Sequence, residues 1–348
     1  MKAAFLTDLR QIEVRDTKEP QLKDARNALL RVDAVGVCGS DVHYYTAGRI
    51  GSAVVDFPFI MGHECAATVL EVGAEVGRLR PGQRVAIDPL ISCGQCDQCR
   101  AGRAHTCRNQ RFLGMPGECG GALAEYLVLP EECCYPVPDR MTTEEAVLAE
   151  PLSIAVYAQQ LSQVDDGARI AILGAGPIGL SVLLACCAAA DCRVYVTDLI
   201  AERLELASRL GAAWTGNPTQ GDVVNAIRGA DALGVDVVFE CAGKQETLDQ
   251  AIELLKPGGT LLIVGIPETD RISFPIHALR RKELAIKNVR RQNRCTALTI
   301  DLLASGRISV APLVTHHFSL SAAQAAFDLV AGYGDGVVKA LIHVPDQP

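Results

Sequence analysis

Short apolar runs separated by glycine, proline and polar residues fill residues 1–153 of the chain. Ala28–Val35 and Ala122–Leu129 are two such runs, and the turn residues Pro81-Gly82 introduce a third at Val85–Ile87. Runs of this length between turn residues are typical of β-strands. The pattern over residues 1–153 therefore predicts an antiparallel, barrel-like β region.

Between residues 154 and 290, strand-like and helix-like segments alternate. The strand-like segments are Arg169–Leu173, Val194–Thr197, Val235–Glu240 and Leu261–Val264, and the helix-like ones include Pro177–Ala190 and Ala201–Leu210. This alternation predicts βαβ units, in which helices cover both faces of a parallel sheet. Residues 291–348 add two helices and two strands, at Ala297–Ala304, Leu313–His316, Ala322–Tyr333 and Val337–Val344.

One uncharged segment, Ile170–Ala190, is long enough to cross a bilayer. Gly174-Ala175-Gly176-Pro177 divides it, however, and Pro177 suits the first turn of a helix. We therefore expect a strand, a turn and a buried helix there, and no membrane partner. Because Met1–Asp8 has no apolar stretch of the kind found in secretory signals, we also expect a cytoplasmic protein.

Length and composition are those of an ordinary globular protein. The chain has 348 residues, enough for two domains, with 49% apolar and 21% charged residues. Its formal net charge of -8 argues against nucleic acid as a partner. The 14 cysteines need a separate explanation. In a protein that is not exported, clustered cysteines indicate metal sites or reactive thiols more often than disulfides.

Three glycines after the first predicted parallel strand, Gly174, Gly176 and Gly179, have the spacing of a dinucleotide-binding turn. They allow a tight turn, close approach of a pyrophosphate and close packing of the following helix on the strand. Asp198 ends the next predicted strand, where a carboxylate can bind a ribose hydroxyl and repel a 2′-phosphate, so NAD is favoured over NADP. A helix N-cap is the alternative role for Asp198. The predicted cofactor residues are Gly174, Gly176, Ile178, Gly179, Asp198, Arg203, Val264, Gly265, Ile266 and Arg290.

A compact run of four cysteines, Cys93, Cys96, Cys99 and Cys107, predicts a structural zinc site. Four thiolates match tetrahedral zinc and leave no position open for a substrate. An iron–sulfur cluster and a redox disulfide are the alternatives, although the spacing fits neither common ferredoxin pattern. A second, dispersed set consists of Cys38, His63, Glu64 and Glu150. Spacing cannot show that these four meet, and each has an ordinary structural alternative.

Taken together, these motifs closely resemble the zinc-dependent medium-chain dehydrogenase/reductase superfamily, and within it the polyol dehydrogenases of sorbitol and xylitol type. The resemblance is carried by Cys38–Tyr45, Gly48–Gly51, Gly62-His63-Glu64, the four-cysteine run, Glu150–Ser153, the glycine turn with Asp198, and Leu313–His316. It implies an α/β protein with two domains. Residues 1–153 and 291–348 would form a GroES-like, mostly-β catalytic domain around a doubly wound Rossmann NAD-binding domain at 154–290.

The resemblance also implies roles for individual residues. A catalytic zinc ion would be held by Cys38, His63 and Glu64 or Glu150, in addition to the structural zinc ion, giving two per subunit. Ser40 and His43 would relay the proton, while Tyr44, Glu150, Arg291 and Gln292 would contact a small polyol. Phe112 would form an apolar wall, with core packing as the alternative. A homotetramer is expected by analogy.

Three other functions remain open from the sequence. The nearest is an alcohol or L-threonine dehydrogenase of the same superfamily, which Tyr44 and Glu150 disfavour. Another is a non-catalytic zinc protein that binds nucleic acid or a partner protein, which the acidic charge disfavours. The third is a dehydrogenase fold without catalysis. His105, His277, His317 and His343 lie outside every motif and receive no role.

Overall fold

The computed structural model describes residues 1–267 and 269–344 and divides into two compact units. The first consists of Met1–Glu150, Thr296–Gly306 and the residues from Val310 onward, and the second of Pro151–Cys295 and Arg307–Ser309. The predicted domain limits, 153/154 and 290/291, lie a few residues from these limits. None of the helices in the described part of the chain combines the length and apolarity needed to cross a membrane.

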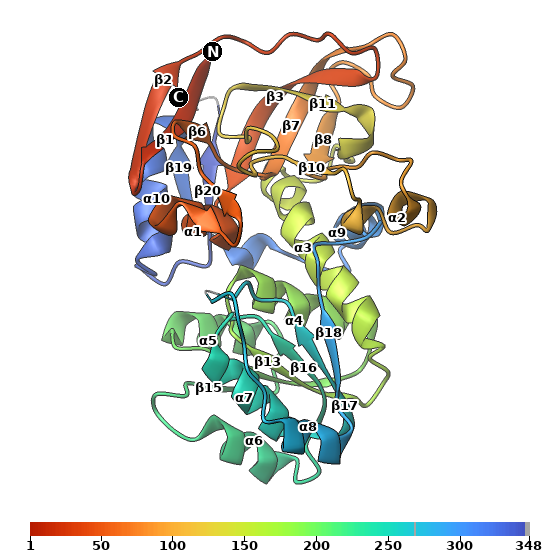
Figure 1. The fold of residues 1–348 in the computed structure, drawn as a ribbon, viewed down its shortest axis with the longest axis vertical. Coiled ribbons are helices and arrows are strands. Elements are labelled where there is room, and N and C mark those ends of the chain that lie inside the picture. The colour runs from red at the N-terminus through yellow and green to blue at the C-terminus, as the bar shows by residue number, and fades with distance from the viewer. Residues whose placement is uncertain (268, 345–348) are drawn as a thin grey trace. The chain divides into compact units, whose positions relative to one another are not determined.

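Strand β3 (Asn27–Gly36) is central to the first unit because it pairs with three other strands (Figure 1). These are β7 (Glu64–Val72), β11 (Tyr126–Pro130) and β20 (Lys339–His343), all antiparallel to it. Leu30 and Val32 of β3 are fully buried in the core of this unit. The predicted β region is therefore present, and a strand from the end of the chain completes it.

One strand predicted in this unit matches the structure, and another begins later than predicted. The strand predicted over Ala28–Val35 is confirmed within β3. The strand predicted over Ala122–Leu129 begins only at Tyr126. The reason is that the backbone N–H groups of Ala122 and Leu123 donate to the carbonyl oxygens of Gly62 and Met61, outside the main sheet.

The sheet around β3 has the order β12-β8-β7-β3-β20-β19, and smaller sheets flank it. The other strands of this unit are β1 (Lys2–Asp8), β2 (Gln11–Asp16), β4 (Arg49–Ile50), β5 (Ala53–Val54), β6 (Phe59–Ile60), β8 (Arg84–Ile87), β9 (Leu90–Ile91), β10 (Arg111–Phe112), β12 (Cys134–Pro136) and β19 (Val314–Ser319). Its helices are α1 (Gly39–Ala47), α2 (Asp97–Arg100), α9 (Thr296–Ala304) and α10 (Ala323–Ala331), with short 3₁₀ turns at Ala104–Thr106, Glu131–Cys133, Ala311–Leu313 and Leu320–Ala322. Helix α3 (Thr143–Ser162), which the sequence did not predict, passes the limit at Glu150.

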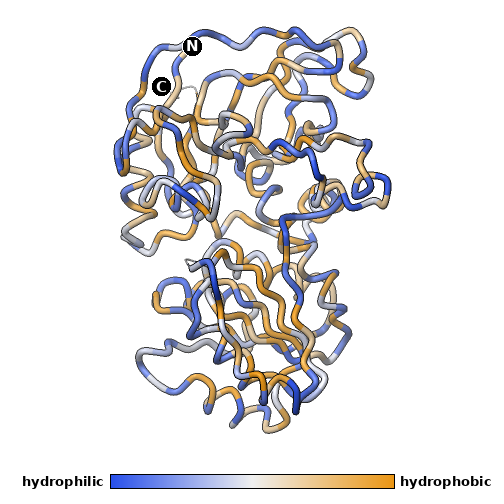
Figure 2. The backbone as a smooth tube through the Cα atoms, viewed as in Figure 1, coloured by the Kyte–Doolittle hydropathy of each residue, from blue (hydrophilic) through white to orange (hydrophobic). Residues whose placement is uncertain are grey.

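The second unit is a six-stranded parallel sheet of order β15-β14-β13-β16-β17-β18. Its strands are β13 (Arg169–Leu173), β14 (Arg193–Thr197), β15 (Trp214–Gly216), β16 (Val235–Glu240), β17 (Leu255–Ile263) and β18 (Ala285–Asn288). The helices are α4 (Pro177–Ala189), α5 (Ala201–Arg209), α6 (Val223–Ala230), α7 (Gln245–Leu254) and α8 (Ile276–Lys282). Figure 2 shows apolar residues concentrated on the strands of this sheet. The predicted α/β fold with a doubly wound parallel sheet is confirmed.

Candidate functional site

Cys38, His63 and Glu64 converge because β3 and β7 are neighbours in the sheet. Cys38 follows β3 as the N-cap residue of α1, and His63 directly precedes Glu64, the first residue of β7. Glu64 lies opposite Gly36 in the register of the two strands. One ligand atom from each of the three side chains lies within 4.8 Å of the other two. A sulfur, an imidazole nitrogen and a carboxylate oxygen are donors that zinc accepts, so this set fits a zinc ion with one further position open.

Asp41, which the sequence analysis did not single out, orients the histidine of this group. It is fully buried, and its carboxylate lies 3.4 Å from Nδ1 of His63. The same carboxylate accepts hydrogen bonds from the backbone N–H groups of Cys38 (3.3 Å) and Gly62 (3.2 Å). Burial opposes protonation of His63, but Asp41 and Cys38 hold the pKa of this histidine well above its ordinary value. A carboxylate behind a histidine in this way is typical of zinc sites, where it fixes the ring orientation.

Lys339 is a second residue that the sequence analysis missed. Its side chain and that of Glu64 are each 1% exposed, and Nζ of Lys339 lies 2.6 Å from Oε2 of Glu64. Nζ also donates to the carbonyl oxygen of Val37 at 3.0 Å. Burial opposes the charge of this lysine, yet Glu64 and Cys38 keep its pKa above the ordinary value. One oxygen of Glu64, Oε2, is therefore held by a buried cation.

Glu150 lies in α3. Among the described residues, it does not join the group of Cys38, His63 and Glu64, whose ligand atoms lie within 4.8 Å of one another. It is nevertheless buried, and it interacts electrostatically with His63 and Glu64. Burial raises the pKa of Glu150 to about 8, with Glu64 adding to the shift and His63 opposing it. Of the two glutamates predicted as ligands, Glu64 is the one that the structure brings to Cys38 and His63.

The predicted relay and substrate residues of the first unit lie at different depths. The Ser40 hydroxyl donates to Sγ of Cys38 at 3.3 Å, and His43 is half-buried on the same helix. Tyr44 is 5% exposed and belongs to the hydrophobic core of the unit. Phe112 packs against His63, with ring centroids 5.3 Å apart. Ser40 and Phe112 therefore border the candidate metal site directly.

The four cysteines of the predicted structural site come together around α2. Sγ of Cys96 lies 3.6 Å from Sγ of Cys99 and 3.9 Å from Sγ of Cys107, and the Cys93–Cys107 separation is 3.4 Å. Tetrahedral zinc with Zn–S bonds of about 2.3 Å requires sulfurs about 3.8 Å apart. A disulfide requires about 2.05 Å, so these sulfurs are not bonded to one another. Backbone N–H groups of Arg108 and Cys99 lower the pKa of Cys96 to about 6, which favours the thiolate that zinc binds.

The glycine turn of the second unit is built as the spacing predicts. Gly174 has a positive φ of 103°, and a Cβ on Gly179 would come within 1.8 Å of the Gly174 carbonyl oxygen. Only glycine allows this contact between the helix and the turn. Arg203 is buried, and its guanidinium lies 3.8 Å from the Cβ position of Gly176, so a positive charge lies beside the turn. Such a turn at the start of α4 fits a cofactor pyrophosphate.

Asp198 supports the glycine turn and does not cap a helix. Its Oδ2 accepts from the Ala175 N–H at 2.6 Å, and its Oδ1 accepts from the Ile200 N–H at 2.9 Å. The N-cap residue of α5 is Ile200, so the alternative role as N-cap is wrong. The Asp198 carboxylate therefore lies at the glycine turn.

Most of the remaining predicted residues of the second unit follow the carboxyl ends of β17 and β18, and Ile178 lies on α4. Val264 and Gly265 follow β17, and both of their N–H groups donate to the Glu240 carbonyl oxygen. Ile266 is 43% exposed and Ile178 is half-buried on α4. Arg290 is exposed, Arg291 has a positive φ of 54°, and Gln292 is buried and accepts from the Cys295 N–H at 2.7 Å. Arg291 and Gln292 belong to the second compact unit, although the sequence placed them in the catalytic domain.

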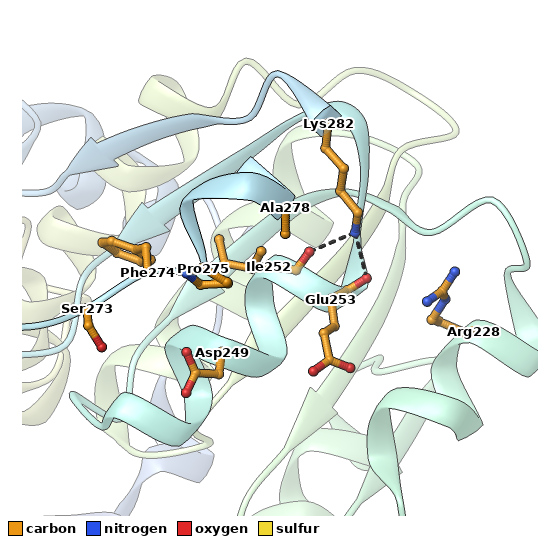
Figure 3. A pocket seen from close by; sticks show the side chains of 9 residues that line it. All are labelled: Arg228, Asp249, Ile252, Glu253, Ser273, Phe274, Pro275, Ala278 and Lys282. Atoms are coloured by element: carbon orange, nitrogen blue, oxygen red, sulfur yellow. Dashed lines mark hydrogen bonds between the residues drawn. The ribbon is translucent and has the colours of Figure 1, made fainter. Parts of the chain in front are cut away.

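A surface pocket of about 750 Å³ in the second unit has no role in this chemistry (Figure 3). Its walls include α7 and α8, and none of the predicted cofactor residues lines it. Nζ of Lys282 donates to the carbonyl oxygens of Ile252 (2.7 Å), Glu253 (3.0 Å) and Leu255 (2.7 Å). Lys282 therefore satisfies backbone carbonyl groups at the C-terminal end of α7, so its role in the pocket wall is structural.

Comparison with known proteins agrees with this geometry. Residues 24–139 match the alcohol dehydrogenase GroES-like domain, and residues 177–305 match the zinc-binding dehydrogenase family. Sorbitol dehydrogenase of Bacillus subtilis is 36% identical over 99% of this chain and 97% of its own length. D-xylulose reductase A of Aspergillus oryzae is 35% identical over 97% and 95%. A structure from Sinorhizobium meliloti with NADP bound is 33% identical, with a TM-score of 0.90 over 98% of each chain.

A GroES-like unit that carries both the four-cysteine cluster and the Cys38–His63–Glu64 cluster, together with a Rossmann unit, defines a zinc-dependent dehydrogenase. The chain belongs to the zinc-dependent medium-chain dehydrogenase/reductase superfamily. Within that superfamily it is similar to polyol dehydrogenases. The resemblance seen in the sequence motifs is thereby confirmed.

Proposed function

We propose that the protein oxidises a secondary hydroxyl of a small polyol, such as sorbitol or xylitol, and transfers the hydride to NAD. The observation that carries this proposal is the convergence of Cys38, which is partly buried, with the buried His63 and Glu64. A zinc ion bound there supplies a Lewis acid that lowers the pKa of an alcohol hydroxyl. The similarity to sorbitol dehydrogenase and D-xylulose reductase supports a polyol as the alcohol.

The proton released from the hydroxyl would pass through Ser40 and His43. Ser40 is suitably placed because its hydroxyl already lies 3.3 Å from the Cys38 sulfur. Imidazole suits the second position because it exchanges a proton near neutral pH. We expect His43→Ala to slow polyol oxidation chiefly at low pH. A variant with an unchanged pH–rate profile would contradict the relay.

NAD is the proposed cofactor because of the charge of Asp198. This carboxylate lies at the glycine turn, where a 2′-phosphate would meet its negative charge. The Sinorhizobium meliloti structure holds NADP, so similarity alone does not choose between the two cofactors. We expect Asp198→Asn to lower the NAD/NADP ratio of kcat/KM at least about tenfold. Asp191→Asn, at an exposed acid of the same unit, should leave the ratio unchanged.

Selectivity for polyols would come from polar side chains near the reacting hydroxyl. Glu150 is a buried carboxyl near the metal group, and Phe112 provides an apolar face against His63. We propose that Tyr44, Arg291 and Gln292 contact the other hydroxyls. A site that binds hydroxyls in this way discriminates strongly against substrates that lack them. Ethanol and threonine should therefore be poor substrates, which separates this function from an alcohol or L-threonine dehydrogenase.

A substrate panel tests the proposal directly. NAD reduction would be followed with sorbitol, xylitol, galactitol, ethanol and threonine, before and after chelation of the metal. We expect activity with at least one polyol, loss on chelation and recovery with added zinc. Cys38→Ser should abolish activity while the exposed Cys187→Ser does not. Activity with threonine or ethanol alone would refute the polyol assignment, and activity that survives both chelation and Cys38→Ser would refute the zinc assignment.

A further inference from the structure

A third group of metal-ligand side chains lies on the first unit, apart from both zinc clusters. It consists of Glu144, His317 and His343, and one ligand atom from each lies within 4.8 Å of the other two. The sequence analysis gave these histidines no role, and the proposed reaction does not use them. Glu144 belongs to the first turn of α3, His317 to β19 and His343 to β20.

The pairing of β19 with β20 explains why the two histidines meet. The strands are parallel, with His317 opposite Leu341 and Ser319 opposite His343. His317 and His343 are therefore offset by two residues in register, which places them on the same face of the sheet. Their rings are stacked with centroids 5.1 Å apart, and Nδ1 of His317 lies 2.8 Å from Nε2 of His343.

This separation is close to the one that a shared metal ion requires. Two imidazole nitrogens on tetrahedral zinc, each about 2.0–2.1 Å from the ion, are about 3.3 Å apart. The rings need to open by only about half an ångström to accept an ion between them. His317 is exposed, so this movement is not resisted by core packing.

The charges of the group also suit a cation. Burial and the neighbouring His317 lower the pKa of His343, which favours the unprotonated ring that a metal ion binds. Burial opposes ionisation of Glu144, but hydrogen bonds from its own backbone and Thr142, together with the two histidines, keep its pKa below the ordinary value. The group thus presents two imidazoles and one carboxylate anion.

We propose that Glu144, His317 and His343 form a binding site for a divalent transition-metal ion that prefers imidazole, such as zinc, copper or nickel. Imidazole nitrogen is a common ligand for these ions, whereas magnesium and calcium prefer oxygen. With three protein ligands, the ion keeps at least one position for water. Binding would connect the first turn of α3 to β19 and β20. The proposal does not depend on the substrate or the cofactor of the enzyme.

The test uses the full chain, without a histidine tag, loaded with zinc at its internal sites and then dialysed. Zinc chloride would be added in a calorimetric titration to the wild type and to His317→Ala, His343→Ala and His316→Ala. His316 is the matched control because it adjoins His317 but contacts Thr315 and Asp335 instead. We expect one further zinc equivalent in the wild type and in His316→Ala, and at least tenfold weaker binding in the other two variants. Equal binding in all four proteins, or no further equivalent in the wild type, would overturn the proposal.

A spectroscopic measurement keeps the test decisive if His343→Ala folds poorly. Cupric ion added at one equivalent to the zinc-loaded wild type should give an electron paramagnetic resonance spectrum with two nitrogen ligands. The exposed His317→Ala variant should give a spectrum with fewer nitrogen ligands, and its dehydrogenase activity should equal that of the wild type. An oxygen-only spectrum, or one that His317→Ala leaves unchanged, would refute the site.

Discussion

Replacing Lys339 with methionine tests whether the buried ion pair with Glu64 holds the candidate metal site in its present form. Methionine keeps much of the volume of lysine but removes its charge, leaving the Glu64 carboxylate buried without its cation. Both side chains are 1% exposed, so solvent cannot replace the lost partner. At 2.6 Å and an effective dielectric constant of about 20, the attraction between the two charges is about 6 kcal/mol.

The measurable loss is smaller than this attraction, because burying two charges costs free energy that the pair must first offset. Removal of one partner from a buried pair costs about 3–5 kcal/mol of unfolding free energy. At roughly 2–4 °C per kcal/mol for a unit of this size, the melting temperature should fall by about 6–20 °C. The double variant Glu64→Gln/Lys339→Met removes both charges, and we expect it to be more stable than Lys339→Met alone.

Differential scanning calorimetry on chelator-treated protein provides the assay, since zinc would otherwise offset the charge of Glu64. In zinc-loaded protein the same substitution should cost less. Lys256→Met is the matched control because Lys256 pairs with Asp236 but is 39% exposed, and such pairs contribute only about 0–1 kcal/mol. The reasoning is refuted if Lys339→Met loses no more stability than Lys256→Met, or if the double variant is less stable than Lys339→Met.

Three further predictions concern the metal group, the glycine turn and the pH dependence of stability. Asp41→Asn should lower zinc affinity about 10–100-fold, because the carboxylate behind His63 is lost, and metal analysis after dialysis against a weak chelator would show it. Gly179→Ala should raise the Kd for NAD while leaving zinc content intact, because the added Cβ would displace the turn, whereas Gly221→Ala, with open space around it, should not. Burial raises the pKa of Asp236, but Lys256 and Arg169 together bring it below the ordinary value of 3.8. Because the pKa of Asp236 is lower in the folded than in the unfolded state, this carboxylate stabilises the protein above pH 3.8, and the contribution is lost as the pH falls below that value. Asp236→Asn should therefore destabilise the protein at pH 7 and have little effect near pH 2. Urea unfolding at the two pH values would show this difference.

Local pattern was enough to predict the second unit closely, because each of its elements carries its own signal. The strand at Arg169–Leu173 is confirmed without change, and the helix predicted over Pro177–Ala190 ends one residue earlier. The two edge strands were not predicted, because β15 has only three residues and β18 only four, and neither is fully buried. Helix α3 was missed for a different reason: Pro151 lies inside it, and proline ordinarily argues against a helix interior.

The candidate metal site could be predicted only in part, because its buried charges are paired across long sequence separations. Lys339 lies in an apolar run, Val337–Val344, and a lone lysine there would ordinarily face solvent. Its partner is 275 residues away along the chain. Asp41 was similarly hidden, since its position after Cys38 resembles an ordinary first-turn acid of a helix. Motifs identified the ligands, and only the fold identified what holds them.

The charged groups around Cys38, His63 and Glu64 give a physical reason for a metal ion at this site of the first unit. The side chains gathered there are the partly buried Cys38 and the buried Asp41, His63, Glu64, Glu150 and Lys339. Three carboxyl groups and a thiol thus face one lysine and one histidine, so acidic groups outnumber basic ones where water cannot screen them. Burial is the main reason that the pKa of Glu150 is raised, and its neighbour Glu64 adds to the shift because it disfavours a further negative charge. A divalent cation held by Cys38, His63 and Glu64 would remove the excess, so the residues that make this point unfavourable without metal are those that make it a strong site for zinc.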